Sequence, residues 1–243
     1  MKNKLILGSL LLALALPAQT VTNSFFLNNP GVVIPEGNLV GVSRSFTVSG
    51  LSGVIDNLQV DLDITGGFNG DLYMYLVDPL GHLAVLLNRV GLSAGNPFGY
   101  SEAGFNLTLD SSGSYGNVHS YGPPTLNGSG QVTGTFSADG RNINPQSVGS
   151  VFDGASTSAG LSLFNGLNGG DVNGVWTLFV ANIATGGGSP TLQQARLTTT
   201  AIPEPSPTAF SLLGGGLLAL LVVKRKVRWP QKKSRSAKPT MDR

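Results

Sequence analysis

The strongest constraint on the fold is a two-residue alternation of apolar and polar side chains along residues 58–65. Apolar residues occupy every second position: Leu58, Val60, Leu62 and Ile64. Because successive side chains of a β-strand point to opposite faces, this pattern predicts a strand with one buried face. Two carboxylates, Asp61 and Asp63, then lie on the other face. Residues 105–110 repeat the alternation and predict a second strand of the same kind.

Two further runs, at 71–77 and 83–87, are apolar on both faces, as expected for strands in the middle of a sandwich. Asp78-Pro79-Leu80-Gly81 between them predicts a turn, with proline second and glycine fourth. Residues 175–181 and 194–200 predict another strand pair, joined through Gly186-Gly187-Gly188. Between residues 21 and 202 no stretch shows a capped helical stripe. We therefore expect an all-β fold, an antiparallel sandwich or barrel.

The N-terminus has the layout of a secretory signal peptide over residues 1–20. A basic start, Met1-Lys2-Asn3-Lys4, precedes a 12-residue apolar stretch, and small residues around Ala18 suit cleavage. The apolar stretch is too short to cross a bilayer comfortably. An uncleaved anchor is the alternative interpretation.

The C-terminus predicts a membrane span. Residues 207–223 are 17 positions without charge, enough for roughly 26 Å of helix, which is at the short end for a hydrocarbon core. Nine Lys or Arg residues follow against one acid, beginning with Lys224, Arg225, Lys226 and Arg228, and such a block stays cytoplasmic. We expect a Pro-rich linker at 201–207, a transmembrane helix at 208–223 and a basic cytoplasmic tail at 224–243. A buried C-terminal core helix is the alternative.

Pro203, Glu204 and Pro205, followed by this span and basic cluster, resemble the PEP-CTERM sorting signal of Gram-negative bacteria that make exopolysaccharide. The resemblance implies two partners: exosortase, a membrane-embedded cysteine transpeptidase that cuts the signal, and exopolysaccharide. It also implies export through the inner membrane, with the β domain in the periplasm before processing and in the envelope or outside the cell afterwards. The basic tail beyond Trp229 is longer than is usual in that family.

Charge is unevenly distributed along the chain. The whole chain is formally +2, but residues 21–202 hold four arginines, no lysine and eleven acids, a net charge of −7. An acidic, lysine-free domain argues against a nucleic-acid partner, whose phosphates need a basic face. It suits cation binding or simple solubility. The chain has no cysteine, which excludes disulfides, thiolate catalysis and cysteine-bound metal.

Two separated stretches resemble the P domain (Homo B domain) of kexin- and furin-type proprotein convertases. They are Gly70-Asp71-Leu72 with the Pro79-Leu80-Gly81 turn, and Gly174-Val175-Trp176-Thr177-Leu178. The match covers residues 40–200, after a lead-in at 21–39, and implies a jelly-roll-like β-sandwich. In convertases this domain accompanies the catalytic domain and does not cut peptides itself. Asp78 stands where that family has Ser, and residues 65–69 lack its His.

No catalytic constellation is visible in the sequence. A subtilisin-type triad needs a much larger α/β fold, and the chain has neither a Gly-x-Ser-x-Gly elbow nor a His-Glu-x-x-His motif. We interpret the two histidines, His82 and His119, as turn and loop residues. A glycosidase needs two acids across a cleft. Asp61 and Asp63 are expected roughly 6–7 Å apart on one strand, which is typical of a solvated face.

Calcium is the metal that the sequence favours, because calcium takes several hard oxygen ligands. Asp63, Asn69 and Asp71 flank a glycine-rich loop, and a second set, Asp153, Asn168 and Asp171, lies near another. Neither spacing is that of an EF-hand loop, so purely structural roles are the alternative. We expect no other cofactor.

Three functions stay open. The leading one is a non-enzymatic envelope or matrix protein linked to exopolysaccharide or biofilm. The second is a carbohydrate-binding module in which Tyr73 and Tyr75, on one strand face, stack on sugars; ordinary packing is the alternative, as it is for Trp176 in a strand core. The third is an accessory domain of a subtilisin-like protease system.

Overall fold

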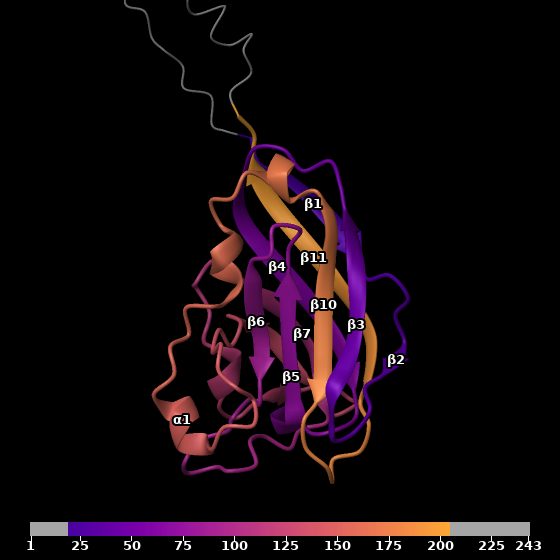
Figure 1. The fold of residues 1–243 in the computed structure, drawn as a ribbon, viewed down its shortest axis with the longest axis vertical. Coiled ribbons are helices and arrows are strands. Elements are labelled where there is room, and N and C mark those ends of the chain that lie inside the picture. The colour runs from indigo at the N-terminus through magenta and orange to yellow at the C-terminus, as the bar shows by residue number, and fades with distance from the viewer. Residues whose placement is uncertain (1–18, 205–243) are drawn as a thin grey trace, which may run out of the picture. The chain divides into compact units, whose positions relative to one another are not determined.

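The computed structural model describes residues 19–204, which form two stacked β-sheets (Figure 1). The seven-stranded sheet has the order β1 (Val21–Phe26), β11 (Thr191–Ile202), β4 (Val54–Thr65), β7 (Gly104–Asp110), β9 (Val132–Phe136) and β8 (Thr125–Leu126), with β2 (Val32–Val33) also on β11. The four-stranded sheet has the order β3 (Asn38–Val48), β10 (Gly174–Asn182), β5 (Leu72–Val77) and β6 (Leu83–Asn88).

Helical structure in this region is confined to short turns. They are α1 (Gly149–Asp153) and the 3₁₀ turns Asn69–Asp71, Val118–Ser120, Leu161–Phe164 and Gly169–Val172. The expected all-β sandwich is confirmed. Its strand pairs are antiparallel, as expected, except that β7 and β9 run parallel.

The alternation at residues 58–65 matches β4, whose side chains point alternately into the core and towards the outer face of the sheet. Its apolar side chains are buried against the opposite sheet: Leu58, Val60, Leu62 and Ile64. Trp176 of β10 lies fully buried in the same core, with its ring centroid 4.9 Å from that of Phe164. The Trp176 indole N–H donates to the Val172 carbonyl oxygen at 2.8 Å, so burial leaves this polar group satisfied. The prediction that Trp176 is a core residue is confirmed.

Two expectations about strands were wrong in detail. Residues 84–87 are buried on both faces, whereas Leu83 is partly exposed. The segment after β9 lies along the edge of β6: the Val85 N–H donates to the Ala159 carbonyl oxygen, and the Gly140 N–H donates to the Val85 carbonyl oxygen. Residues 72–77 instead alternate between buried and partly exposed positions. The strands at 175–181 and 194–200 do not pair, because β10 and β11 belong to different sheets and the glycine-rich connection crosses between them.

The seven-stranded sheet includes β1 and β2, which both lie in the expected lead-in at residues 21–39. β1 pairs with β11 from Val21 opposite Ala201 to Phe26 opposite Arg196. The predicted signal peptide lies almost wholly outside the described residues, and the transmembrane helix at 208–223 and the basic tail at 224–243 lie wholly outside them. Within residues 19–204, no helix is long and apolar enough to cross a membrane.

Gly104 at the start of β7 provides a test of the sheet packing. Its φ is +99°, and a Cβ there would lie 2.0 Å from the Ile64 carbonyl oxygen on β4. Gly104→Ala should therefore lower the free energy of unfolding by about 3–4 kcal/mol, measured by urea denaturation of the purified protein. Gly113→Ala is the matched control: φ is +72° there but no atom lies within 4 Å, so we expect a loss of about 1–2 kcal/mol. Equal losses would show that β4 and β7 move apart freely.

Candidate functional site

His82 belongs to the turn between β5 and β6. Its Nδ1 lies 2.7 Å from Asp78 Oδ2, and Asp78 Oδ1 accepts hydrogen bonds from the backbone N–H groups of Leu80 and His82. Both carboxylate oxygens of Asp78 therefore hold the turn in shape. The His82 side chain is 43% exposed, which agrees with its interpretation as a turn residue.

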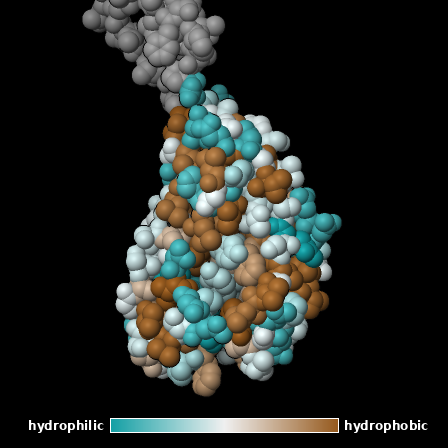
Figure 2. Space-filling model, in the orientation of Figure 1, coloured by the Kyte–Doolittle hydropathy of each residue, from teal (hydrophilic) through white to brown (hydrophobic). Residues whose placement is uncertain are grey.

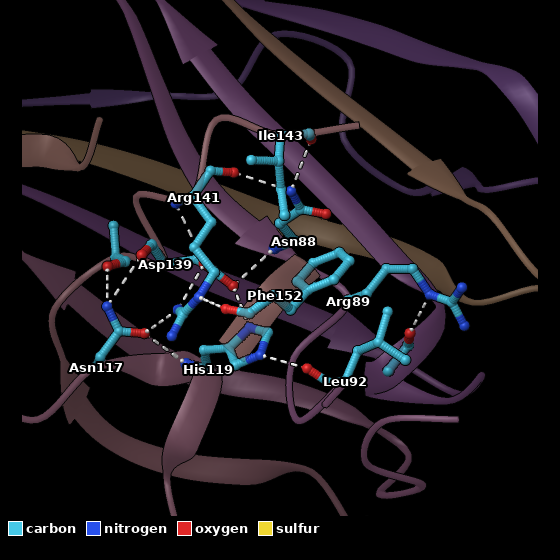
Figure 3. A network of polar contacts seen from close by, with 11 residues as sticks. Asn88, Arg89, Leu92, Asn117, His119, Asp139, Arg141, Ile143 and Phe152 are labelled. Carbon is cyan, nitrogen blue, oxygen red and sulfur yellow. Dashed lines mark hydrogen bonds and ion pairs between the residues drawn. The ribbon is translucent and has the colours of Figure 1, made fainter. Parts of the chain in front are cut away.

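His119 is buried in a polar network next to β6 (Figure 3). Its Nδ1 lies 2.7 Å from Asp139 Oδ2, and its Nε2 lies 3.0 Å from the Leu92 carbonyl oxygen. Both ring nitrogens thus lie within hydrogen-bond distance of oxygen atoms from other segments of the chain. His119 therefore joins the 3₁₀ turn Val118–Ser120 to the segments after β6 and β9.

Asp139 is the centre of this network. It is fully buried, and its Oδ1 accepts from Arg141 Nη1 at 3.1 Å while its Oδ2 also accepts from the Asn88 backbone N–H at 3.1 Å. Two side chains from different segments, His119 and Arg141, therefore surround one carboxylate. This arrangement joins the loop after β9 to the end of β6 (Figure 3).

The two carboxylates of β4 lie on the outer face of the seven-stranded sheet, as predicted. Asp61 Oδ1 accepts from the Thr108 hydroxyl at 2.6 Å, and its Oδ2 accepts from Arg196 Nε at 2.7 Å. Asp63 Oδ1 accepts from Gln131 Nε2 at 2.8 Å. Both oxygens of Asp61 are therefore engaged by side chains of the two neighbouring strands, β7 and β11, which agrees with its interpretation as part of a polar outer face.

Three aromatic rings cluster on the outer face of the four-stranded sheet. Tyr75 stacks on Phe179 with ring centroids 4.7 Å apart and planes 15° apart, and Tyr73 lies 5.7 Å from Tyr75. The Phe179 ring passes over Gly41 of β3, where a Cβ would lie 2.6 Å from a ring carbon. We call Tyr73, Tyr75 and Phe179 the aromatic face. All three side chains are partly exposed.

Figure 1 shows the strands of the four-stranded sheet towards the viewer, and Figure 2 shows apolar residues exposed among polar ones on that side. Val175 of β10 and Val40 of β3 are among the exposed apolar residues. Burial raises the pKa of both Tyr73 and Tyr75, so their phenol groups stay neutral at physiological pH. Each can then donate and accept a hydrogen bond.

The residues of the calcium hypothesis have separate surroundings. Asp63 faces outward on β4, whereas the buried Asn69 side chain is committed to the backbone N–H and carbonyl of Gly104. Asp71 lies beside a cation already, because Arg89 Nη2 is 3.7 Å from its Oδ1. Burial raises the pKa of Asp71 and the Arg89 charge opposes this shift.

Two members of the second set of calcium candidates accept hydrogen bonds from backbone N–H groups. Asp153 accepts from the Ala94 N–H, and Asn168 accepts from the Gly170 N–H. Among residues 19–204 no group of three or more His, Cys, Asp or Glu side chains is placed to hold a metal ion. Calcium binding stays a prediction from the sequence.

Sequence reasoning missed the partners that complete these clusters. Arg196 lies opposite Asp61 only because β11 pairs with β4 in one register, and Phe179 meets Tyr75 only through the pairing of β10 with β5. Asp139 comes from the segment after β9, 20 residues beyond His119. The alternation along β10 was the one available signal, because it places Phe179 on the face opposite Trp176.

Comparison with known proteins does not identify a function for this site. No protein-family model and no curated protein matches the chain. Among solved structures, the serine protease of Aeromonas sobria in complex with its chaperone ORF2 matches 76% of this chain with 14% identity and a TM-score of 0.42. The serine protease of Aeromonas sobria on its own matches 75% with 13% identity and a TM-score of 0.40. This chain spans 28% and 27% of those chains, and likeness at this level carries no information about activity.

Removal of the carboxylate at the centre of the buried network should greatly lower the stability of the fold. Asp139→Ala leaves Arg141 without its counter-charge and the buried His119 Nδ1 without its hydrogen-bond partner, so the free energy of unfolding should fall by about 3–5 kcal/mol in urea denaturation. Asp56→Ala is the control, because Asp56 is an exposed carboxylate on β4, and we expect a change below about 0.5 kcal/mol. A loss for Asp139→Ala no larger than that of Asp56→Ala would contradict the structural role of the network.

Proposed function

We propose that this protein is a non-catalytic module of the bacterial cell envelope that contacts polysaccharide through its aromatic face. It is exported by its N-terminal signal peptide, held by its C-terminal span and delivered to exosortase by the PEP-CTERM signal. The observation that carries the polysaccharide contact is the cluster of Tyr73, Tyr75 and Phe179 on an open sheet face.

Three properties of the aromatic face support this proposal. Rings on a rigid sheet lose little conformational freedom when a sugar ring packs against them, because their neighbours already fix them. The neutral phenols of Tyr73 and Tyr75 supply hydrogen-bond donors and acceptors of the kind that sugar hydroxyls need. The surroundings of both histidines, with Asp78 and Asp139 fixing a turn and a loop, support a non-catalytic role.

The delivery part of the proposal rests on the sequence of the two ends. An export signal in front and a sorting signal behind are mutually consistent, and the acidic, lysine-free module between them contrasts with the basic tail. The module is then periplasmic before processing and part of the envelope or extracellular matrix afterwards. Its P-domain-like motifs favour a role as a folded accessory rather than as an enzyme.

The aromatic face can be tested by binding to the exopolysaccharide of the producing organism. Tyr73→Ala and Tyr75→Ala should each weaken retention of the purified full chain on that polymer about ten-fold, because each removes one stacking ring. The measurement is affinity electrophoresis in gels that contain the polymer, with thermal melts to confirm folding.

Tyr115→Ala is the matched control for these variants. Tyr115 is 45% exposed and belongs to the segment after β7, outside the strands that carry the aromatic face, so its loss should leave retention unchanged. Polysaccharide binding through the aromatic face is refuted if the unmodified protein is not retained, or if all three variants migrate alike.

The sorting signal can be tested separately in the producing cell. Replacing Pro203, Glu204 and Pro205 by alanine should leave the full-length precursor in the membrane fraction, because the transpeptidase no longer recognises its site. Immunoblots of membrane and secreted fractions measure the ratio of precursor to product. Pro207→Ala, which leaves the tripeptide intact, should be processed normally. Unchanged processing of the triple variant would show that the tail is not a PEP-CTERM signal.

A further inference from the structure

The outer face of the seven-stranded sheet carries a hollow of about 420 Å³, on the sheet that does not bear the aromatic face. Strands β1, β11, β4, β7 and β9 line it, with Phe26, Asp61, Asp63, Asn106, Thr108, Gln194 and Arg196 among its side chains. Its volume is within the range of roughly 300–1,000 Å³ that is usual for small-ligand sites. The hollow is open and has both polar and apolar groups in its walls, so it can accept part of a long polymer.

Two rows of side chains cross the hollow because of the strand register. The first row runs from Arg196 through Asp61 to Thr108. The second row runs from Gln194 through Asp63 to Asn106. Adjacent strands lie about 4.8 Å apart, so the polar groups in each row are spaced closely enough to contact neighbouring groups on one ligand.

The first row is held rigid by its own hydrogen bonds, and the second row is less committed. Thr108 and Arg196 both bond to Asp61, which fixes all three side chains before any ligand arrives. Asp63 uses one oxygen for Gln131, and Asn106 is exposed. Arg196 bonds Asp61 through Nε, and with a side chain 47% exposed it presents its guanidinium to the hollow. A site that recognises hydroxyl groups needs free hydrogen-bond donors and acceptors. It binds more tightly when these groups are already held in place, because less conformational entropy is then lost on binding.

Phe26 gives the hollow an apolar wall. It is 60% exposed and lies on β1 directly opposite Arg196, at the side of the hollow formed by the edge strand. A single exposed phenylalanine does not by itself indicate a binding site. Beside two polar rows, however, it offers the ring face against which the C–H side of a sugar packs.

Charge selects among glycans. Asp61 and Arg196 neutralise one another, which leaves Asp63 as the uncompensated charge among the side chains that line the hollow. A polymer that carries carboxylates would meet this negative charge within a domain of net charge −7, so an acidic glycan is disfavoured. We propose that the hollow is a second binding site, for an uncharged glycan segment, in which Phe26 packs on a sugar ring and Asn106, Asp63 and Arg196 bond its hydroxyl groups.

The site can be tested by titration calorimetry of the purified full chain in a mild detergent. The probes are three neutral hexasaccharides, cellohexaose, laminarihexaose and maltohexaose, and an acidic one, an alginate hexamer. At least one neutral probe should bind, and Phe26→Ala and Asn106→Ala should each weaken it about five- to ten-fold. The alginate hexamer should bind at least about ten-fold more weakly than the best neutral probe.

Each variant has a matched control that keeps the residue type and changes the location. Phe98→Ala removes a phenylalanine that is 80% exposed in the segment after β6, and Asn142→Ala removes an exposed asparagine in the segment after β9. Neither lines the hollow, and both should leave the dissociation constant unchanged. Neither Phe26 nor Asn106 lies in the core, so both hollow variants should melt as the unmodified protein does.

The possible results separate this site from the aromatic face. If no neutral probe binds, if the alginate hexamer binds more tightly, or if Phe26→Ala and Asn106→Ala bind as well as their controls, the hollow is not a site for uncharged glycan. Weakening by Tyr73→Ala together with no effect of Phe26→Ala would overturn the hollow and leave the proposed function standing. Weakening by the hollow variants alone would establish the hollow, and the aromatic face would then be decided by retention on the exopolysaccharide.

Discussion

The contact between the inner faces of the two sheets is what the rest of this structure depends on. The chain has no cysteine, so no disulfide supports the fold, and β4 and Trp176 meet in a core that burial alone must stabilise. Because inward positions of each strand are reserved for this core, the outward positions between them can carry polar or aromatic side chains. The polar rows and the aromatic face therefore both consist of the outward-facing side chains of strands whose inward-facing side chains form the core.

The course of the strands could be predicted from the sequence where one face is buried and the other is not. The pattern of residues 58–65 located β4 and correctly assigned Asp61 and Asp63 to its outer face. Local alternation does not predict burial where burial depends on a distant segment. The segment after β9 lies along the edge of β6, whereas β5 lies between β6 and β10, and no local pattern in 71–77 or 83–87 contains that difference.

The site was predictable only one strand at a time. Tyr73 and Tyr75 share a face by simple alternation, but their contact with Phe179 requires knowing that β10 is the neighbour of β5. The connection between β10 and β11 resembles a hairpin in sequence because it is short and rich in glycine. In the fold it moves the chain from one sheet to the other, and strand order, unlike strand position, is decided by such long-range packing.

The pairing of β1 with β11 has a mechanical consequence. Val21 lies opposite Ala201, so the chain enters and leaves the sandwich at adjacent positions of one ladder. Tension applied between these two ends would open the β1–β11 hydrogen bonds one after another, as a zipper opens. Tension between the C-terminal end and a ligand held in the hollow of the seven-stranded sheet would instead load many hydrogen bonds of β11 in shear at once. The seven-stranded sheet would thus resist pulling through a ligand on its outer face better than pulling through its own two ends.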